Sequence, residues 1–166
     1  MGVYRNSNLA FYDGAKGGGL IKNVTLACMD NPEKLLGVIK ASWFIITNER
    51  YVYTSVQEIV CPEKHLLIIN DGKELTIVTN ENNLSLLGKY QSNKERWRLL
   101  NIRCGNPFYC VGFIAYITNA LARHGIDIVI TSSYSNDLVL VMEDDLDKSI
   151  EVLTQIGFEN KTREIH

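Results

Sequence analysis

The chain has 166 residues, a length that suits one medium-sized domain or two very small domains packed together. Hydrophobic residues make up 46% and charged residues 22% of it, which excludes a disordered or collagen-like chain. Its 17 basic and 19 acidic residues give a formal net charge of −2, so no basic excess is present to bind a nucleic-acid backbone. The length also leaves no comfortable room for a kinase or dehydrogenase catalytic domain.

The apolar segments predict a cytoplasmic protein without a membrane partner. The longest one, 109–122, contains Gly112, Thr118 and Asn119 and is shorter than the roughly 20 apolar residues that a membrane span requires. The first residues lack the apolar stretch of a secretory signal.

The cysteines do not form a recognisable metal or cofactor motif. Cys28, Cys61, Cys104 and Cys110 include no C-x-x-C pair, and no two histidines have the spacing of zinc ligands. We therefore expect reduced thiols packed as small hydrophobic residues, with no metal and no cofactor.

The first 41 residues contain a segment without regular structure, a strand and a helix. Residues 1–22 are rich in glycine and asparagine and lack the spacing of a phosphate-binding loop, so we expect a flexible segment. A short strand is predicted at 24–29. Asp30 and Pro32 then mark the beginning of a helix that ends near Ala41.

Two β-hairpins are predicted next. In the first, the aromatic and β-branched runs 43–47 and 51–54 are joined by a turn at 48–50. In the second, strands at 66–69 and 75–79 are joined around Asp71-Gly72. A short helix capped by Asn82 or Asn83 ends at Gly88, and the polar segment 89–96 is a candidate boundary between two halves.

The remaining residues predict a β-α-β-β-α-β order, the α+β ferredoxin-like plan. The apolar residues of the first helix recur on one helical face, and His124-Gly125 ends that helix. The unbroken apolar run of the third strand indicates that both of its faces are covered, by sheet pairing, a dimer or a contact between the two halves. The predicted elements are a strand at 97–103, a helix at 110–124, strands at 126–131 and 138–141, a helix at 144–156 and a strand from 158. Whether that last strand stays with its own half or completes the first half is open.

The glycine and apolar pattern of 110–117, followed by Leu-Ala-Arg-His-Gly-Ile-Asp-Ile at 121–128, resembles the ACT domain. Residues 130–141 are similar to the "STYDTDYILV" segment of small double-ACT proteins related to aspartokinase regulatory domains and to cytosolic arginine sensors. In one respect the sequence departs from these proteins, because Val111 stands where they usually have a small hydroxyl residue before the helix glycine.

This resemblance implies two ferredoxin-like units in tandem, with antiparallel sheets backed by helices. The expected division is a flexible segment at 1–22, a divergent ACT-like half at 23–92, which resembles the family more weakly, and an ACT domain at 93–166. Such domains are regulatory modules that bind amino acids, often at an interface between paired domains. The resemblance thus implies a small amino acid as ligand, a homodimer, and a regulated protein whose identity the sequence does not give.

A receptor for a free amino acid needs hydrogen-bond donors and an acceptor close together. The beginning of the 110–124 helix offers backbone N–H groups and the positive end of the helix dipole, and Gly112 permits a close approach. Asp127 is a candidate acceptor for the ammonium group, and the resemblance assigns a cationic side chain to Asp137. The candidate ligand-binding residues are Asn106, Val111, Gly112, Phe113, Ile114, Asp127, Ile128 and Asp137.

Structural roles compete with binding roles at these positions. Gly112 can serve tight packing of helix on sheet, and Asn106 can belong to an ordinary turn. Asp127 can lie on the wet face of a strand, and Asp137 can be a turn residue.

The sequence thus predicts a non-catalytic regulatory module; the alternative is a structural or protein-interaction module that has the fold but no ligand. A cysteine hydrolase is disfavoured, because Cys110 and His124 would stand about 21 Å apart at opposite ends of one helix.

Overall fold

The computed structural model of the chain describes residues 32–105 and 109–162. Its helices and strands, in chain order, are α2 (Pro32–Lys40), β1 (Trp43–Val56), η1 (Pro62–Lys64), β2 (His65–Asn70), β3 (Leu75–Asn80), η2 (Glu81–Leu86), β4 (Tyr90–Ser92), β5 (Trp97–Arg103), α3 (Phe113–Arg123), β6 (Ile128–Ser132), β7 (Asp137–Met142), η3 (Glu143–Asp145), α4 (Leu146–Gln155) and β8 (Glu159–Asn160). None of the helices in these ranges is long and apolar enough to cross a membrane.

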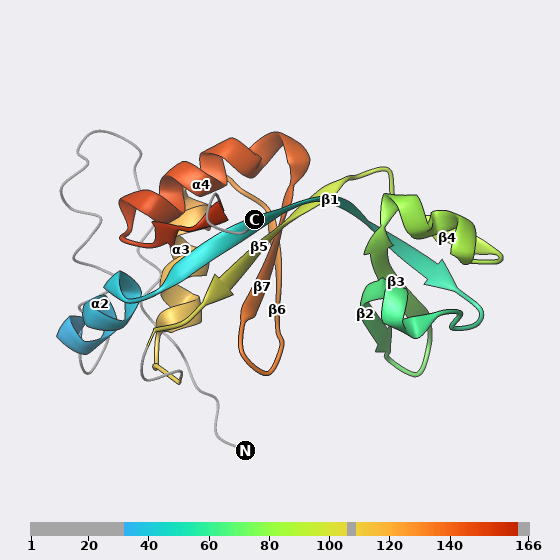
Figure 1. Cartoon of the computed structure of the whole chain (residues 1–166), viewed down its shortest axis with the longest axis horizontal. Coiled ribbons are helices and arrows are strands. Elements are labelled where there is room, and N and C mark those ends of the chain that lie inside the picture. Colours follow the sequence, from blue (N-terminus) through green and yellow to red (C-terminus); the bar gives the residue numbers. More distant parts are fainter. Residues whose placement is uncertain (1–31, 106–108, 163–166) are drawn as a thin grey trace, which may run out of the picture.

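The eight strands found in the described ranges belong to one sheet. Its order is β2-β3-β1-β5-β7-β6, and β4 and β8 also pair with β1. Helices α2, α3 and α4 gather at one end of the molecule, while β2, β3 and β4 lie at the other, and β1 and β5 run between the two ends (Figure 1).

Strand β1 connects the two ends because its partners change along its length. Residues 43–46 and 50–51 pair antiparallel with β5, whereas 51–56 pair antiparallel with β3. Residues 54–56 also pair with β4, and Trp43 and Phe44 pair in parallel with β8. One strand of 14 residues therefore contacts four others.

The predicted hairpin at 43–54 is wrong, because these residues form the continuous strand β1. The polar residues 48–50 are not a turn but the place where the pairing with β5 shifts register, between Ile46 and Arg50. A bulge of this kind bends a strand and increases its twist without ending it. Here it lets β1 leave one part of the sheet and enter the other.

Ion pairs surround the bulge at the middle of β1. The Arg50 Nε atom lies 2.7 Å from a Glu143 carboxylate oxygen, and Arg98 of β5 lies 3.7 Å from the same oxygen. Glu81 of η2 accepts from Arg96 at 3.1 Å and lies 3.6 Å from Arg50. The network joins residues on either side of the predicted boundary, although its exposed members limit the stability it contributes.

The second half follows the predicted β-α-β-β-α-β order, from β5 to β8. Antiparallel pairing of β5 with β7 and of β7 with β6 gives the α+β fold that the sequence predicted. The other hairpin is also confirmed, as β2 and β3. The predicted helix at the beginning of the described chain is α2, with Pro32 as its first residue.

Strand β7 is covered on both faces, as its sequence predicted. Val139 and Val141 belong to the core beneath the helices, together with Ile39 of α2 and Leu153 of α4. Leu138 and Leu140 belong to a second cluster that includes Tyr51 of β1 and Val78 of β3. Contact between the two halves of the chain therefore covers the second face.

Three details of the prediction need correction or completion. The helix predicted at 144–156 begins later, at Leu146 with Asp145 as its N-cap, because Asp144 lies within the preceding 3-10 turn η3. The short helix near 82–87 is a 3-10 helix whose N-cap is Asn80, with its side chain accepting from the Asn82 N–H. The last strand, β8, pairs with β1 and so joins the half that precedes it in the sequence. The predicted strand at 24–29 and the segment 1–22 lie outside the described residues.

The close contact of α2 with the end of β5 can be tested at Gly105. A Cβ atom there would lie 2.8 Å from both the Ala41 Cβ and the Val38 carbonyl oxygen, so the backbone of α2 would have to move. We expect Gly105→Ala to lower the free energy of unfolding by about 1–3 kcal/mol, measured by urea denaturation.

Gly37→Ala is the matched control, because nothing lies within 4 Å of the added Cβ and the site is inside the same helix. It should raise the free energy of unfolding by about 0.5–1 kcal/mol. Equal stability of Gly105→Ala and the wild type would contradict this packing.

Candidate functional site

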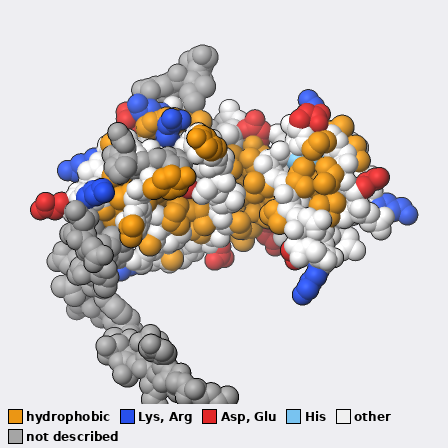
Figure 2. Space-filling model, turned by 90° about the horizontal axis from the view of Figure 1, so that it is seen from below, with side chains coloured by type: hydrophobic (Ala, Val, Ile, Leu, Met, Phe, Trp, Pro, Cys, Tyr) orange, Lys and Arg blue, Asp and Glu red, His pale blue; other side chains and the backbone are white. Residues whose placement is uncertain are grey.

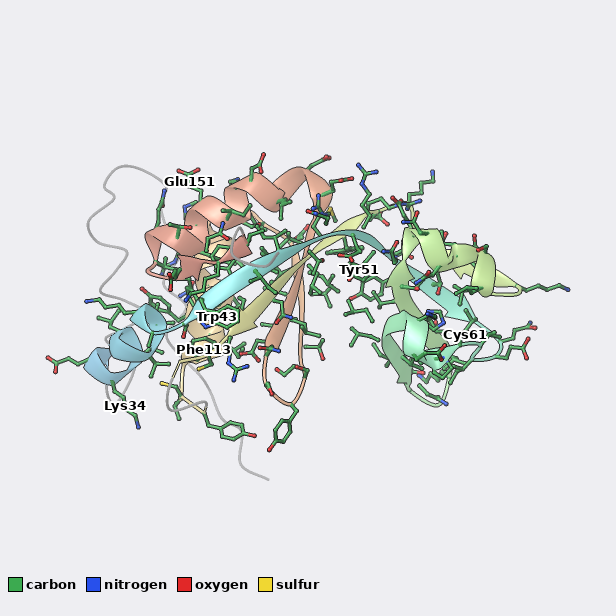
Figure 3. The ribbon with its side chains drawn as sticks, viewed as in Figure 1. Lys34, Trp43, Tyr51, Cys61, Phe113 and Glu151 are labelled. Atoms are coloured by element: carbon green, nitrogen blue, oxygen red, sulfur yellow. The ribbon has the colours of Figure 1, made fainter. Side chains whose placement is uncertain are left out.

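A groove of about 460 Å³ lies where α3 begins and strands β6 and β7 are joined. We call it the α3 groove. Its lining consists of Tyr109, Cys110, Val111, Phe113, Ile114, Ser132, Ser133, Tyr134 and Asp137. Figure 3 shows Phe113 at the end of the molecule that carries α2, while Cys61 lies at the opposite end.

One wall of the groove is made by the residues that lead into α3. Gly112 has a φ of 88°, the left-handed conformation that suits glycine, and the helix begins after it at Phe113. The predicted helix at 110–124 is thus too long at its first end, and Cys110 lies outside α3. The Phe113 N–H donates to the Cys110 carbonyl at 3.1 Å. The next two N–H groups, of Ile114 and Ala115, stand at positions that have no carbonyl partner within a helix.

The opposite wall is the tight connection from β6 to β7. The Ser133 N–H donates to the Asn136 carbonyl at 2.8 Å, and the Asn136 N–H donates to the Ser133 hydroxyl at 3.2 Å. These bonds turn the chain within a few residues and bring Ser132, Ser133 and Asp137 to the same side of the groove.

Asp137 is the ionisable residue of this wall. Its side chain is buried, and the Ser132 hydroxyl donates to it at 2.6 Å. The pKa of the nearby Cys104 thiol is raised to about 11, mainly because the thiol is buried and next because the negative charge of Asp137 disfavours the thiolate. A carboxylate in such surroundings favours a cation beside it, because burial weakens its hydration.

The open edge of the groove is apolar. Tyr134 is 97% exposed, Val111 93% and Tyr109 87%. Ile114 adds a fourth side chain that is partly exposed. These residues come from the segment before α3, from its first turn and from the β6–β7 connection.

The structure brings together several of the residues that the sequence singled out. Val111, Phe113, Ile114 and Asp137 line the α3 groove, and Gly112 lies between two of them. Asn106 lies outside the described residues. Whether any of them binds a ligand stays a prediction.

The other two predicted residues lie elsewhere. Asp127 is exposed and Ile128 begins β6, near the end of α3 rather than its beginning. The 11 residues of α3 span about 16 Å, which separates this position from the groove.

Sequence reasoning missed the contributions of Tyr109, Ser132, Ser133 and Tyr134 to the groove. The segment 132–136 was placed between two predicted strands, and no binding role was assigned to it. Its signal was the run Ser-Ser-Tyr-Ser two residues before Asp137, because loops held by a rigid scaffold often carry binding residues.

Other hollows in the described part of the chain offer less chemistry. One, of about 610 Å³, lies over Ser55, Gln57 and Gln91 near β4. A second, of about 440 Å³, lies beside the ion pairs of Arg50 and Arg98. Neither is lined by a buried carboxylate, and both arginines of the second are already paired with Glu143.

The α3 groove lies within a segment that matches a known family. Residues 92–155 match the family model described as "ACT domain", which covers less than half of the chain. This segment is therefore similar to ACT domains. The α+β, ferredoxin-like fold of the described residues agrees with this similarity. No curated protein matches the sequence.

The similarity to solved structures extends over a larger part of the chain than residues 92–155. A protein of unknown function from Vibrio cholerae superposes with a TM-score of 0.66 at 17% identity, covering 75% of this chain and 97% of that one. A protein from Agrobacterium tumefaciens gives a TM-score of 0.62 at 20% identity, covering 75% and 96%.

The regulatory subunit of aspartate kinase from Thermus thermophilus, in its ligand-free form, gives a TM-score of 0.52 at 12% identity, covering 70% and 96%. At these identities the similarity concerns the fold alone.

The environment of Asp137 and Cys104 can be tested by alkylation. With a pKa of about 11, the Cys104 thiol is a reactive thiolate in roughly one molecule in a thousand at pH 8. We expect iodoacetamide to modify the partly buried Cys61 and Cys110 first, and Cys104 about tenfold faster for each pH unit between 8 and 10. Mass spectrometry of the peptides measures the rates.

Denatured protein is the control, because its cysteines should react at similar rates. Modification of Cys104 as fast as Cys110 in the folded protein at pH 8 would contradict the buried, electronegative setting assigned to it.

Proposed function

We propose that the chain is a non-catalytic regulatory module that binds a small amino acid in the α3 groove. The observation that carries the proposal is the position of the buried Asp137 carboxylate across one groove from the beginning of α3, within the ACT domain. A volume of about 460 Å³ is in the range of small-molecule sites.

Each charged group of an amino acid has a complement in the groove. The ligand carboxylate accepts from the N–H groups of Ile114 and Ala115, where the helix dipole adds a positive field. The ligand ammonium group donates to Asp137, whose other partner is the Ser132 hydroxyl. Asn106 precedes this wall in the sequence and remains a predicted ligand, whereas Asp127 and Ile128 do not contact a ligand in this groove.

A route of direct contacts leads from the groove to the rest of the molecule. The Phe113 ring lines the groove and packs edge-on against Phe158, with ring centroids 5.7 Å apart. Phe158 precedes β8, which pairs with Trp43 and Phe44 of β1. A ligand that binds one position of Phe113 more tightly than another therefore shifts the equilibrium between the corresponding arrangements of the sheet. The free energy of this shift equals the difference between the ligand's binding free energies for the two arrangements.

The module acts, in this proposal, as a cytoplasmic homodimer that reports ligand occupancy to a regulated protein. Strand β6 offers an edge for the second copy, because β7 is its only strand partner among the described residues. Its sequence Ile-Val-Ile-Thr-Ser carries no charge or proline that would oppose pairing.

A protein-interaction module without a ligand is the second candidate. The apolar edge of the α3 groove favours it, and Figure 2 shows hydrophobic side chains spread over the lower face at both ends of the molecule. Exposed apolar surface of this kind is typical of interaction sites. A stable dimer in light scattering, together with the absence of any ligand effect, would favour this candidate.

A thermal-shift screen of the twenty amino acids tests the proposed function. A ligand at one hundred times its Kd stabilises the folded protein by about 2.7 kcal/mol, a rise in Tm of roughly 5–10 °C for a chain of this size. Asp137→Asn keeps the side-chain volume but removes the charge, and we expect it to abolish this rise.

Asp127→Asn is the matched control, since this exposed carboxylate lies at the far end of α3. It should leave the rise unchanged. The proposal fails if no amino acid raises the Tm of the wild type at millimolar concentration, or if the two variants respond alike.

A further inference from the structure

The lining of the α3 groove is partly polar and partly apolar. Asp137, Ser132 and Ser133 are its polar residues, and the Ser132–Asp137 hydrogen bond of 2.6 Å orients the carboxylate. Tyr109, Val111, Ile114 and Tyr134 are its exposed apolar residues. A ligand that fits this lining carries both charged groups and an apolar group.

The count of charges in the groove limits what the ligand carries. Among the described residues that line it, Asp137 is the only carboxylate and no lysine or arginine is present. The ammonium group that every amino acid carries needs this carboxylate. A cationic side chain would compete for it and leave one positive charge without a partner, and an acidic side chain would find no cation. The side chain of the ligand is therefore neutral.

Three of the apolar lining residues differ from the rest of the surface in their exposure. The other large hydrophobic residues classed as exposed in the described ranges are 36–47% exposed, whereas Tyr109, Val111 and Tyr134 are 87–97% exposed. Two of these are tyrosines, whose rings supply large contact areas at a low cost in conformational entropy. A neutral ligand side chain of aromatic size gains contacts there that a small one does not.

We propose that the α3 groove selects amino acids with a large apolar side chain, aromatic ones foremost, and that Tyr109 and Tyr134 determine this selectivity. The inference rests on the proposed function, because it assigns the ligand class of the same groove. It departs from the expectation that Asp137 receives a cationic side chain, since the ligand ammonium group occupies Asp137.

Calorimetric titration with single amino acids tests the ligand class. We expect L-phenylalanine and L-tyrosine to bind most tightly, L-leucine more weakly and L-alanine at least tenfold more weakly than L-phenylalanine. L-Lysine, L-arginine and L-glutamate should not bind measurably at the same concentration. 3-Phenylpropionate, which lacks the ammonium group, should also fail to bind.

Tyr134→Ala tests whether Tyr134 determines the selectivity. Because the Tyr134 side chain is almost completely exposed, the fold does not depend on it. We expect this variant to weaken L-phenylalanine binding about tenfold. Tyr90→Ala is the matched control, because Tyr90 is an exposed tyrosine on β4, at the other end of the molecule, and its removal should leave the affinity unchanged.

Two results would overturn the inference while the proposed function stands: tighter binding of L-arginine or L-lysine than of L-phenylalanine, or an unchanged L-phenylalanine affinity in Tyr134→Ala. If no amino acid binds in either calorimetry or the thermal-shift screen, both proposals fail together.

Discussion

One strand holds the two ends of this molecule in a single sheet. Strand β1 pairs with β5 and β8 through its first residues and with β3 and β4 through its last. Its buried residues Phe44 and Val52 belong to opposite ends of the fold, and neither is accessible to solvent. Because the strand is continuous, the two ends do not form separate sheets that move independently of each other.

The bulge at the middle of β1 makes this sharing possible. Between Ile46 and Arg50 the strand changes register against β5, and Arg50 is then in place to pair with Glu143. The ion pairs are partly exposed, so they fix the geometry of the crossing more than they stabilise it. Burial around Tyr51, Val78 and Leu140 supplies the stability of the same region.

The α3 groove lies far along the sheet from this crossing but remains connected to it. Its residues belong to the beginning of α3 and to the β6–β7 connection. In the sheet, β6 pairs with β7, β7 pairs with β5, and β5 pairs with β1. On the other side, Phe113 and Phe158 lead to β8 and so to the first residues of β1. The groove thus lies against strands that are paired, directly or through a neighbour, with β1, and its apolar residues are exposed.

Local sequence signals were sufficient for much of this fold. Period and capping residues predicted α2, β5, β7 and the β2–β3 hairpin, because each depends on residues that are close in the chain. The hairpin at 43–54 failed because its polar middle resembles a turn, and the partner that keeps it extended, β5, lies some 50 residues later.

The groove was predictable only in part for the same reason. Val111 to Ile114 were found from the beginning of a helix, but Tyr109 and Tyr134 meet at one groove only through tertiary packing. Asp127 was chosen because it follows the same helix, although the sequence alone does not reveal which end of the strand faces the groove.

Amide hydrogen exchange with and without L-phenylalanine tests most directly whether the α3 groove is the ligand site. The account predicts slower exchange at residues 109–116 and 132–137, with a smaller effect in β8 and at the beginning of β1. Slower exchange confined to the end of the molecule that carries β4, or no change anywhere at saturating ligand, would contradict it.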